Sequence, residues 1–191
     1  MESLKVTVKG LAPLLMHNGH LADPRNPHAR ALREAVNASK KNKTDAAFDA
    51  MAKAEFLGSL YVGEDGALCI PGEMIEATII NGAKKSKQGK QATAAICVFN
   101  NAPLQYKGPK DPLKLWETGN FHKTIGVRVG TNRVMRTRPL FVDWSLSFVV
   151  QYNADLLNKK DVVMAITKAG AEVGLAEWRP RYGRFEVVEV A

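Results

Sequence analysis

Apolar and polar residues alternate with a period of two along parts of the chain. Residues 4–9 read Leu-Lys-Val-Thr-Val-Lys, and residues 140–152 alternate in part. Successive side chains of a β-strand point to opposite faces of a sheet, so this period predicts half-buried strands. We therefore expect strands over both stretches, with 140–152 the longest, and a closing strand at 184–190.

A helical period is clearest over residues 158–173. Val162, Val163 and Ile166 share one apolar stripe there, and Gly174 follows as a residue type that often ends a helix. Thr44 precedes another helical stretch and is a typical N-cap residue. The predicted helices span about residues 28–42, 44–56, 71–82 and 158–173.

Turn-forming residues favour two hairpins. One is expected from residues 60–62 and 67–70, joined by a Gly-Glu-Asp-Gly turn. The other is expected from residues 125–129 and 134–138, joined by Gly-Thr-Asn.

Three further predictions concern the segments between these elements. Residues 84–91 contain no apolar side chain, which predicts a segment that is mobile without a ligand. A short strand is expected at 95–99. Residues 100–124 contain three prolines, so we expect them to be irregular.

The order of the predicted elements alternates strands with helices and includes antiparallel pairs. This order predicts an α+β fold, with a ferredoxin-like (split βαβ) antiparallel sheet, helices on one face and long insertions. A chain of 191 residues suffices for one well-cored domain. We expect a single domain over 1–191, with a helical insertion at about 20–58 and a basic excursion at about 83–138.

Positive charge is concentrated in the middle of the chain. The net charge is +8, and residues 77–142 hold twelve Lys or Arg but only two acidic residues. A solvated loop kept soluble by lysines is the alternative explanation. Because the bias continues through predicted strands, a site for a polyanion is favoured.

The sequence contains no recognisable enzyme motif. Neither a phosphate-binding glycine loop nor a G-x-S-x-G nucleophile motif is present. His17, His20 and His28 share a loop with Asp23, but their spacing matches no zinc site. We therefore expect no catalytic group, no metal and no cofactor.

The apolar runs are too short to cross a bilayer, and the first residues lead directly into a predicted strand. We expect a cytoplasmic protein without membrane contact. Cys69 and Cys97 are then expected to be thiols rather than a disulfide.

Residues 66–75 have a sequence suited to holding an anion. A predicted strand leads through Pro71 and Gly72 into a helix, and N–H groups at a helix start can face an anion. The alternative is an ordinary helix start with proline in its first turn and no ligand.

Residues 174–185 interleave three arginines and two glycines with Trp178 and Tyr182. Arginine binds phosphate with two parallel hydrogen bonds and stacks on bases, and aromatic rings also stack on bases. In the alternative interpretation the rings cover the sheet edge while the arginines pair with Glu186 and Glu189.

The sequence Leu68-Cys69-Ile70-Pro71-Gly72-Glu73-Met74-Ile75, followed by a basic excursion and then by residues 174–185, resembles the RAMP superfamily. Backbone members of this superfamily polymerise along guide RNA in CRISPR interference complexes. The resemblance spans most of the chain. It implies an RNA path across the loop after the first strand, the helix after the Ile-Pro-Gly turn and a basic thumb, formed by 84–90 or 128–138.

Charge and resemblance together predict a non-enzymatic subunit that grips single-stranded RNA by its phosphates. The implied assembly is a head-to-tail homo-oligomer or filament within a CRISPR-type ribonucleoprotein that contains other subunits. The sequence does not exclude DNA as the ligand. The predicted nucleic-acid-binding residues are His17, Asn18, Lys84, Lys85, Lys87, Lys90, Arg128, Arg133, Arg136, Arg138, Arg181 and Arg184.

Two other functions are consistent with the same residues. The basic middle segment could meet an acidic protein in an interaction or assembly module. In the second alternative the chain is a RAMP-type RNA endonuclease, for which Asp23 is the catalytic candidate in the first loop.

Overall fold

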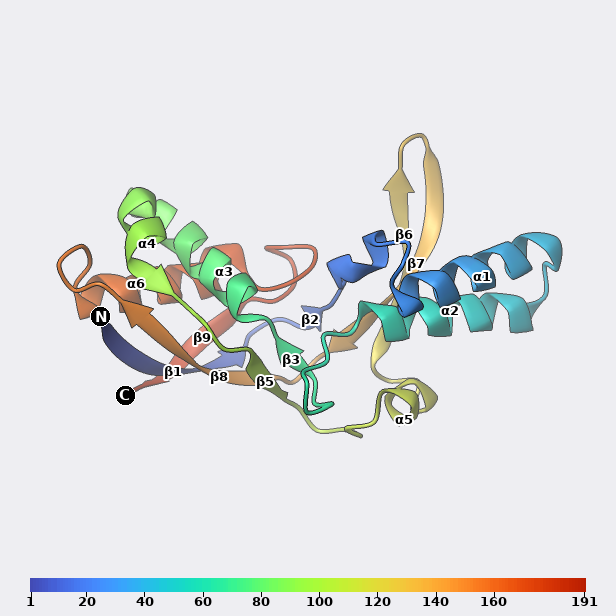
Figure 1. Ribbon diagram of the computed structural model, residues 1–191, viewed down its shortest axis with the longest axis horizontal. Helices are drawn as coiled ribbons and strands as arrows, with labels where there is room; N and C mark the ends of the chain where they lie inside the picture. Colours follow the sequence, from blue (N-terminus) through green and yellow to red (C-terminus); the bar gives the residue numbers. More distant parts are fainter. The chain divides into compact units, whose positions relative to one another are not determined.

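The computed structural model describes residues 1–191, except for the side chain of Val129. The chain is an α+β protein with six α-helices and antiparallel sheets, which confirms the predicted class (Figure 1). It forms two compact units. The first consists of residues 1–15, 62–107 and 142–191, and the second of residues 16–61 and 108–141. The ferredoxin-like topology and the single-domain organisation stay predictions.

A six-stranded sheet forms the centre of the first unit. Its strands run in the order β3–β5–β8–β1–β9, and β4 also pairs with β8. The register places Glu2 opposite Tyr152 and Lys9 opposite Ser145. The six strands are β1 (Glu2–Gly10), β3 (Cys69–Ile70), β4 (Ile96–Cys97), β5 (Ala102–Gln105), β8 (Ser145–Tyr152) and β9 (Phe185–Val190). The first unit also contains β2 (Leu14–Leu15), which is not part of this sheet.

The predicted alternation of apolar and polar residues explains which face of this sheet is buried. Val6 and Val8 of β1 are buried beside Leu146 and Val150 of β8. Helices α3 (Gly72–Lys84), α4 (Gly89–Ala95) and α6 (Lys159–Lys168) lie on the same side of the sheet in Figure 1. One face of each strand is therefore buried in the core, whereas side chains such as Lys9 stay exposed.

Helices α3 and α6 pack closely because a glycine lies between them. A Cβ atom at Gly82 would lie 2.2 Å from the carbonyl oxygen of Ala165 and 2.7 Å from the nitrogen of Ala169. Only a residue without a side chain fits against backbone at this distance. This packing fixes the C-terminal turn of α3, where Lys84 and Lys85 lie.

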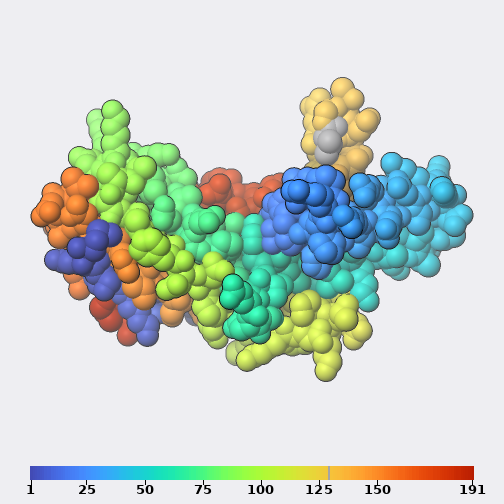
Figure 2. Space-filling view, viewed as in Figure 1, coloured from blue at the N-terminus to red at the C-terminus, as the bar shows by residue number. Residues whose placement is uncertain are grey.

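The second unit combines an α-helical pair with a β-hairpin. Helices α1 (Pro27–Lys41) and α2 (Asp45–Ser59) contact each other, and α2 also contacts β7. Thr44 accepts a hydrogen bond from the N–H of Ala47, so its predicted N-cap role is confirmed. The hairpin pairs β6 (His122–Val129) with β7 (Asn132–Phe141), and it projects from this unit (Figure 1, Figure 2). Helix α5 (Pro112–Glu117) completes the unit.

Several local predictions from the sequence were wrong in part. The hairpin expected over residues 60–70 is reduced to one antiparallel bridge between Val62 and Leu68, and β3 pairs with β5. The long strand expected at 140–152 is divided, since residue 141 ends β7 and β8 begins at Ser145. Residues 100–124 are not irregular throughout: they contain β5 and α5.

The basic segment 84–91 is held by backbone hydrogen bonds. The N–H groups of Lys87 and Gln88 donate to the carbonyl oxygens of Lys84 and Ala83, and α4 begins at Gly89. The strand expected at 95–99 is reduced to β4, because α4 extends through Ala95. Local backbone bonds compensate here for the lack of apolar side chains.

The predicted helices and free thiols are found in the structure as follows. The helices expected at 28–42 and 44–56 are confirmed as α1 and α2. The helix expected at 158–173 is α6 followed by a π-helical turn, Ala169–Val173. Cys69 is a buried free thiol and Cys97 a half-buried one. Among the described residues, no helix combines the length and apolar character that a membrane span requires.

Candidate nucleic-acid interface

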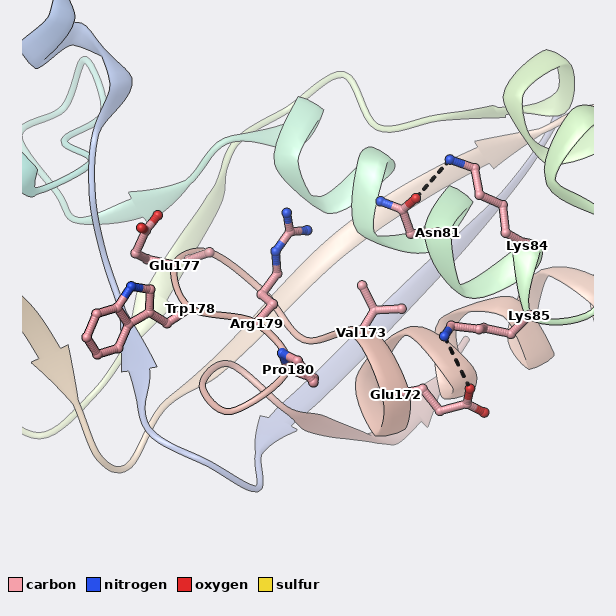
Figure 3. A pocket seen from close by; sticks show the side chains of 10 residues that line it. Asn81, Lys84, Lys85, Glu172, Val173, Glu177, Trp178, Arg179 and Pro180 are labelled. Atoms are coloured by element: carbon pink, nitrogen blue, oxygen red, sulfur yellow. Dashed lines mark hydrogen bonds and ion pairs between the residues drawn. The ribbon is translucent and has the colours of Figure 1, made fainter. Parts of the chain in front are cut away.

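A hollow of about 570 Å³ in the first unit lies between the C-terminal end of α3 and the segment before β9. We call it the tryptophan pocket. Figure 3 shows Lys84 and Lys85 from α3 on one side and Trp178 and Arg179 on the other. Asn81, which belongs to α3, lies between these two groups of side chains. Cationic and aromatic side chains therefore line one hollow, although they are far apart in the sequence.

The last turn of α3 positions the two lysines differently. The ammonium group of Lys84 donates to Oδ1 of Asn81 at 2.9 Å. Lys85 pairs with Glu172 at 3.9 Å, and both side chains are about half exposed. An exposed pair at this distance contributes little stability, so an anionic ligand can compete for Lys85.

The other wall of the tryptophan pocket has an unusual backbone. Ala176 and Trp178 have φ values of 61° and 54°, in the left-handed region that residues with side chains rarely adopt. The turn is held by hydrogen bonds from Leu175 N–H to the Gly183 carbonyl and from Tyr182 N–H to the Trp178 carbonyl. Strained backbone that the surrounding fold enforces is common at binding sites.

This turn leaves the indole of Trp178 accessible. Trp178 is 38% exposed and contacts the buried ring of Tyr182, with centroids 6.2 Å apart. A half-exposed tryptophan at a cationic hollow can stack on an unpaired base. Trp178 therefore supplies a flat apolar surface across the hollow from the lysines (Figure 3).

The four predicted lysines meet at the junction of α3 and α4. Lys84, Lys87 and Lys90 line a second hollow of about 370 Å³, and Lys84 also belongs to the tryptophan pocket. We call Lys84, Lys85, Lys87 and Lys90 the lysine corner. The structure thus brings together one group of the predicted residues, and two of them, Lys84 and Lys85, share the tryptophan pocket with Trp178.

The arginines of residues 174–185 are distributed differently from the prediction. The tryptophan pocket is lined by Arg179, rather than by Arg181 or Arg184. Arg184 donates from Nε to the Pro180 carbonyl at 2.9 Å, and Arg181 is exposed. The interleaved composition indicated this segment, but the left-handed turns decide which of its side chains line the hollow. The predicted binding residues lack Asn81, and they cover Trp178 and Arg179 only through the arginine-rich and aromatic composition of residues 174–185.

In the second unit, the predicted arginines fall into two groups along the hairpin. Arg128 and Arg133 lie opposite each other near its tip, where both are exposed. Like charges in this position repel, which a bound anion would relieve. Arg136 and Arg138 lie farther down β7 and approach the carboxylate of Glu55 on α2.

The buried Glu55 is the centre of a partly buried polar group that we call the Glu55 cluster: His17, Glu55, Arg136 and Arg138. Its Oε2 accepts from the N–H of Thr137 at 2.8 Å, while Oε1 lies 3.4 Å from Arg136 and 3.8 Å from Arg138. Glu55 is only 4% exposed. Arg138 also hydrogen-bonds to Nδ1 of His17.

The environment of His17 keeps its imidazole neutral. Burial, followed by the charges of Arg138 and Arg136, lowers the pKa of His17 from 6.5 to about 4. The adjacent predicted residue, Asn18, has a structural role. Its side chain accepts from the N–H of His20 and donates to the carbonyl of Leu60.

Asp23 lies on the surface of the second unit. Its carboxylate pairs with Arg25 at 3.3 Å and accepts from the Arg25 N–H at 2.9 Å. Within the described part of the chain, no group of three or more His, Cys, Asp or Glu is placed to hold a metal ion. A nuclease role for Asp23 stays an untested alternative.

No protein-family model matches the chain, and no curated protein matches it.

Proposed function

We propose that this chain is a non-enzymatic RNA-binding subunit that holds single-stranded RNA by its phosphates along the lysine corner. The observation that carries the proposal is the tryptophan pocket, in which lysines and an exposed Trp178 line the same hollow. Phosphates would contact the lysines and Arg179, and an unpaired base would stack on Trp178.

The physical argument depends on the combination of charge and ring. A cationic surface alone attracts any polyanion, whereas a base must be unpaired to place its face on an indole. Arg128 and Arg133 at the hairpin tip offer two further phosphate contacts. Three parts of the proposal rest on the resemblance to the RAMP superfamily: RNA as the ligand, the head-to-tail oligomer and the CRISPR-type ribonucleoprotein.

The test is the salt dependence of RNA binding. Fluorescence anisotropy with a short labelled single-stranded RNA, at several salt concentrations, gives the slope of log affinity against log salt. For a single strand this slope is about −0.7 for each phosphate neutralised. Replacing all four residues of the lysine corner by alanine should weaken binding and flatten the slope.

A matched control removes the same charge elsewhere. Lys40, Lys41, Lys159 and Lys160 are all exposed and lie outside the proposed site. Their fourfold alanine variant should retain most of the affinity and slope. Equal losses in both variants, or no binding by the wild-type protein at low salt, would contradict the proposal.

The same preparation separates this function from the two alternatives. Protein that purifies with the absorbance ratio of clean protein and ignores RNA at low salt would favour an acidic protein partner. RNA cleavage in magnesium that disappears in Asp23→Asn would favour the nuclease.

A further inference from the structure

A separate hollow of about 380 Å³ lies within the second unit. The charged and polar side chains on its wall are the Glu55 cluster. Its apolar wall includes Leu21, Leu32 and Val127. These residues come from the first loop, both helices of the α-helical pair and the hairpin. We call this hollow the Glu55 pocket.

The charges around the Glu55 pocket do not balance. Two guanidinium groups face one carboxylate, and the wall contains no other acidic residue. The arginine side chains are 34% and 12% exposed, and that of Glu55 5%. Two cations that share one carboxylate leave a net positive charge in a partly buried site, which is costly. One anionic group in the pocket would compensate it.

The geometry leaves hydrogen-bond donors for such a group. The distances of 3.4 and 3.8 Å from Glu55 to the arginines exceed the ~2.7–2.9 Å typical of a tight charged hydrogen bond. Among the described residues, Arg136 has no partner besides Glu55. A guanidinium has about five N–H donors, so most of those on Arg136 remain for a ligand.

His17 adds a donor without adding charge. Its Nδ1 is hydrogen-bonded to Arg138, which can only donate, so the neutral ring carries its hydrogen on Nε2. The pKa of about 4 keeps this form at neutral pH. The polar part of the pocket is therefore rich in donors.

We propose that the Glu55 pocket binds a phosphate monoester attached to a nucleoside, either as a free nucleoside monophosphate or as the terminal phosphate of an RNA. A monoester has three acceptor oxygens for the donors of Arg136 and His17, and its charge of about −1.5 to −2 at neutral pH more than offsets the one excess positive charge. An internal phosphodiester has fewer free oxygens to accept from these donors.

The apolar part of the pocket fits the rest of such a ligand. Leu21, Leu32 and Val127 offer contacts to a base or ribose, and the volume lies within the range of small-molecule sites, roughly 300–1,000 Å³. The inference uses residues of the second unit alone. It holds whether or not the lysine corner binds RNA.

Isothermal titration calorimetry tests the proposal on the full chain with AMP, UMP, inorganic phosphate and adenosine. The nucleoside monophosphates should bind, and adenosine should not. Arg136→Gln should weaken binding by about tenfold or more, since it removes a charged hydrogen-bond donor. The exposed Arg33 on α1 does not line the pocket, so Arg33→Gln should bind like the wild type.

A second variant covers the case in which Arg136→Gln does not fold. Ala22 is exposed and lines the pocket, so Ala22→Phe adds volume there without removing a charge. It should also weaken mononucleotide binding. Wild-type affinity in both folded variants, or no mononucleotide binding at millimolar concentration, overturns the inference.

The source of the phosphate is decided with RNA of one sequence carrying either terminal phosphates or hydroxyl ends. Tighter binding of the phosphorylated RNA, lost in Ala22→Phe, assigns the pocket to an RNA end. Mononucleotide binding without any end effect assigns it to a free nucleotide. The lysine-corner variant should lose RNA affinity but keep mononucleotide affinity, which separates this test from that of the proposed function.

Discussion

The carboxylate of Glu55 accepts a hydrogen bond of 2.8 Å from the main-chain N–H of Thr137. This bond links the last turns of α2 to the middle of β7 inside the second unit. It also fixes the carboxylate that orients Arg136 and Arg138. One buried acid thus supports both the base of the hairpin and the geometry of the Glu55 pocket.

Glu55→Ala should strongly destabilise the second unit. The substitution leaves a buried N–H and two guanidinium groups without their acceptor, and breaking a buried ion pair costs about 3–5 kcal/mol. The partial exposure of Arg136 places the expected loss near the lower end, about 3 kcal/mol. Urea unfolding followed by circular dichroism measures it.

The exposed Asp49 on the same helix provides the control. Asp49→Ala should change the free energy of unfolding by no more than about 0.5 kcal/mol. Glu55→Gln keeps an oxygen that can accept from Thr137 and should lose less than Glu55→Ala. A loss in Glu55→Ala as small as that in Asp49→Ala would contradict the structural role.

His17 predicts a pH dependence with a defined sign. Its pKa is about 4 in the folded chain against 6.5 ordinarily, so between these values the unfolded chain binds a proton that the folded chain does not. The free energy of unfolding should therefore fall as the pH decreases from about 6.5 to about 4.

His17→Gln removes this proton linkage while retaining an oxygen that can accept from Arg138. Its stability should depend less on pH in that window, although burial also lowers the pKa values of His28 and His122 and leaves some dependence. NMR titration of the His17 ring gives its midpoint directly. A midpoint near 6.5 would show that the ring is not buried against the arginines.

Trp178→Ala should weaken single-stranded RNA binding without changing its salt slope. Stacking of one base on an aromatic ring contributes about 1–3 kcal/mol, which corresponds to roughly 5- to 150-fold in affinity. No charge is removed, so the number of phosphate contacts stays the same. Anisotropy titrations at several salt concentrations separate the two effects.

Trp178→Phe should retain most of the affinity, since it keeps a ring at the same left-handed position. Phe99 is a matched control because it is exposed and lies outside the tryptophan pocket. Phe99→Ala should bind like the wild type. If Trp178→Ala also binds like the wild type, the base does not stack there.

Gly82→Ala should lower the stability of the first unit. The added Cβ would lie 2.2 Å from the Ala165 carbonyl oxygen, and backbone of α6 would have to move. Overpacking of this kind costs about 1–3 kcal/mol. A Cβ at Gly19 meets no atom within 4 Å, so Gly19→Ala should have little effect in the same thermal unfolding measurement.

The sequence by itself determined the periodic elements and the α+β class. The stripe at 158–173 and the Thr44 cap placed helices within a few residues, because a helix face and a cap depend on neighbours three or four positions away. Charge counting also indicated the lysine corner. It could not find β5 or the partner of β3, because strand pairing depends on residues distant in the chain.

Only the tertiary structure decided how the candidate sites are composed. The left-handed residues Ala176 and Trp178 turn Arg179 into the tryptophan pocket, and no local pattern predicts a conformation that the surrounding fold enforces. Glu55 meets the arginines of β7 across about eighty residues of sequence. Composition determines how much charge a chain carries, whereas folding determines which charges are neutralised inside it and which remain for a ligand.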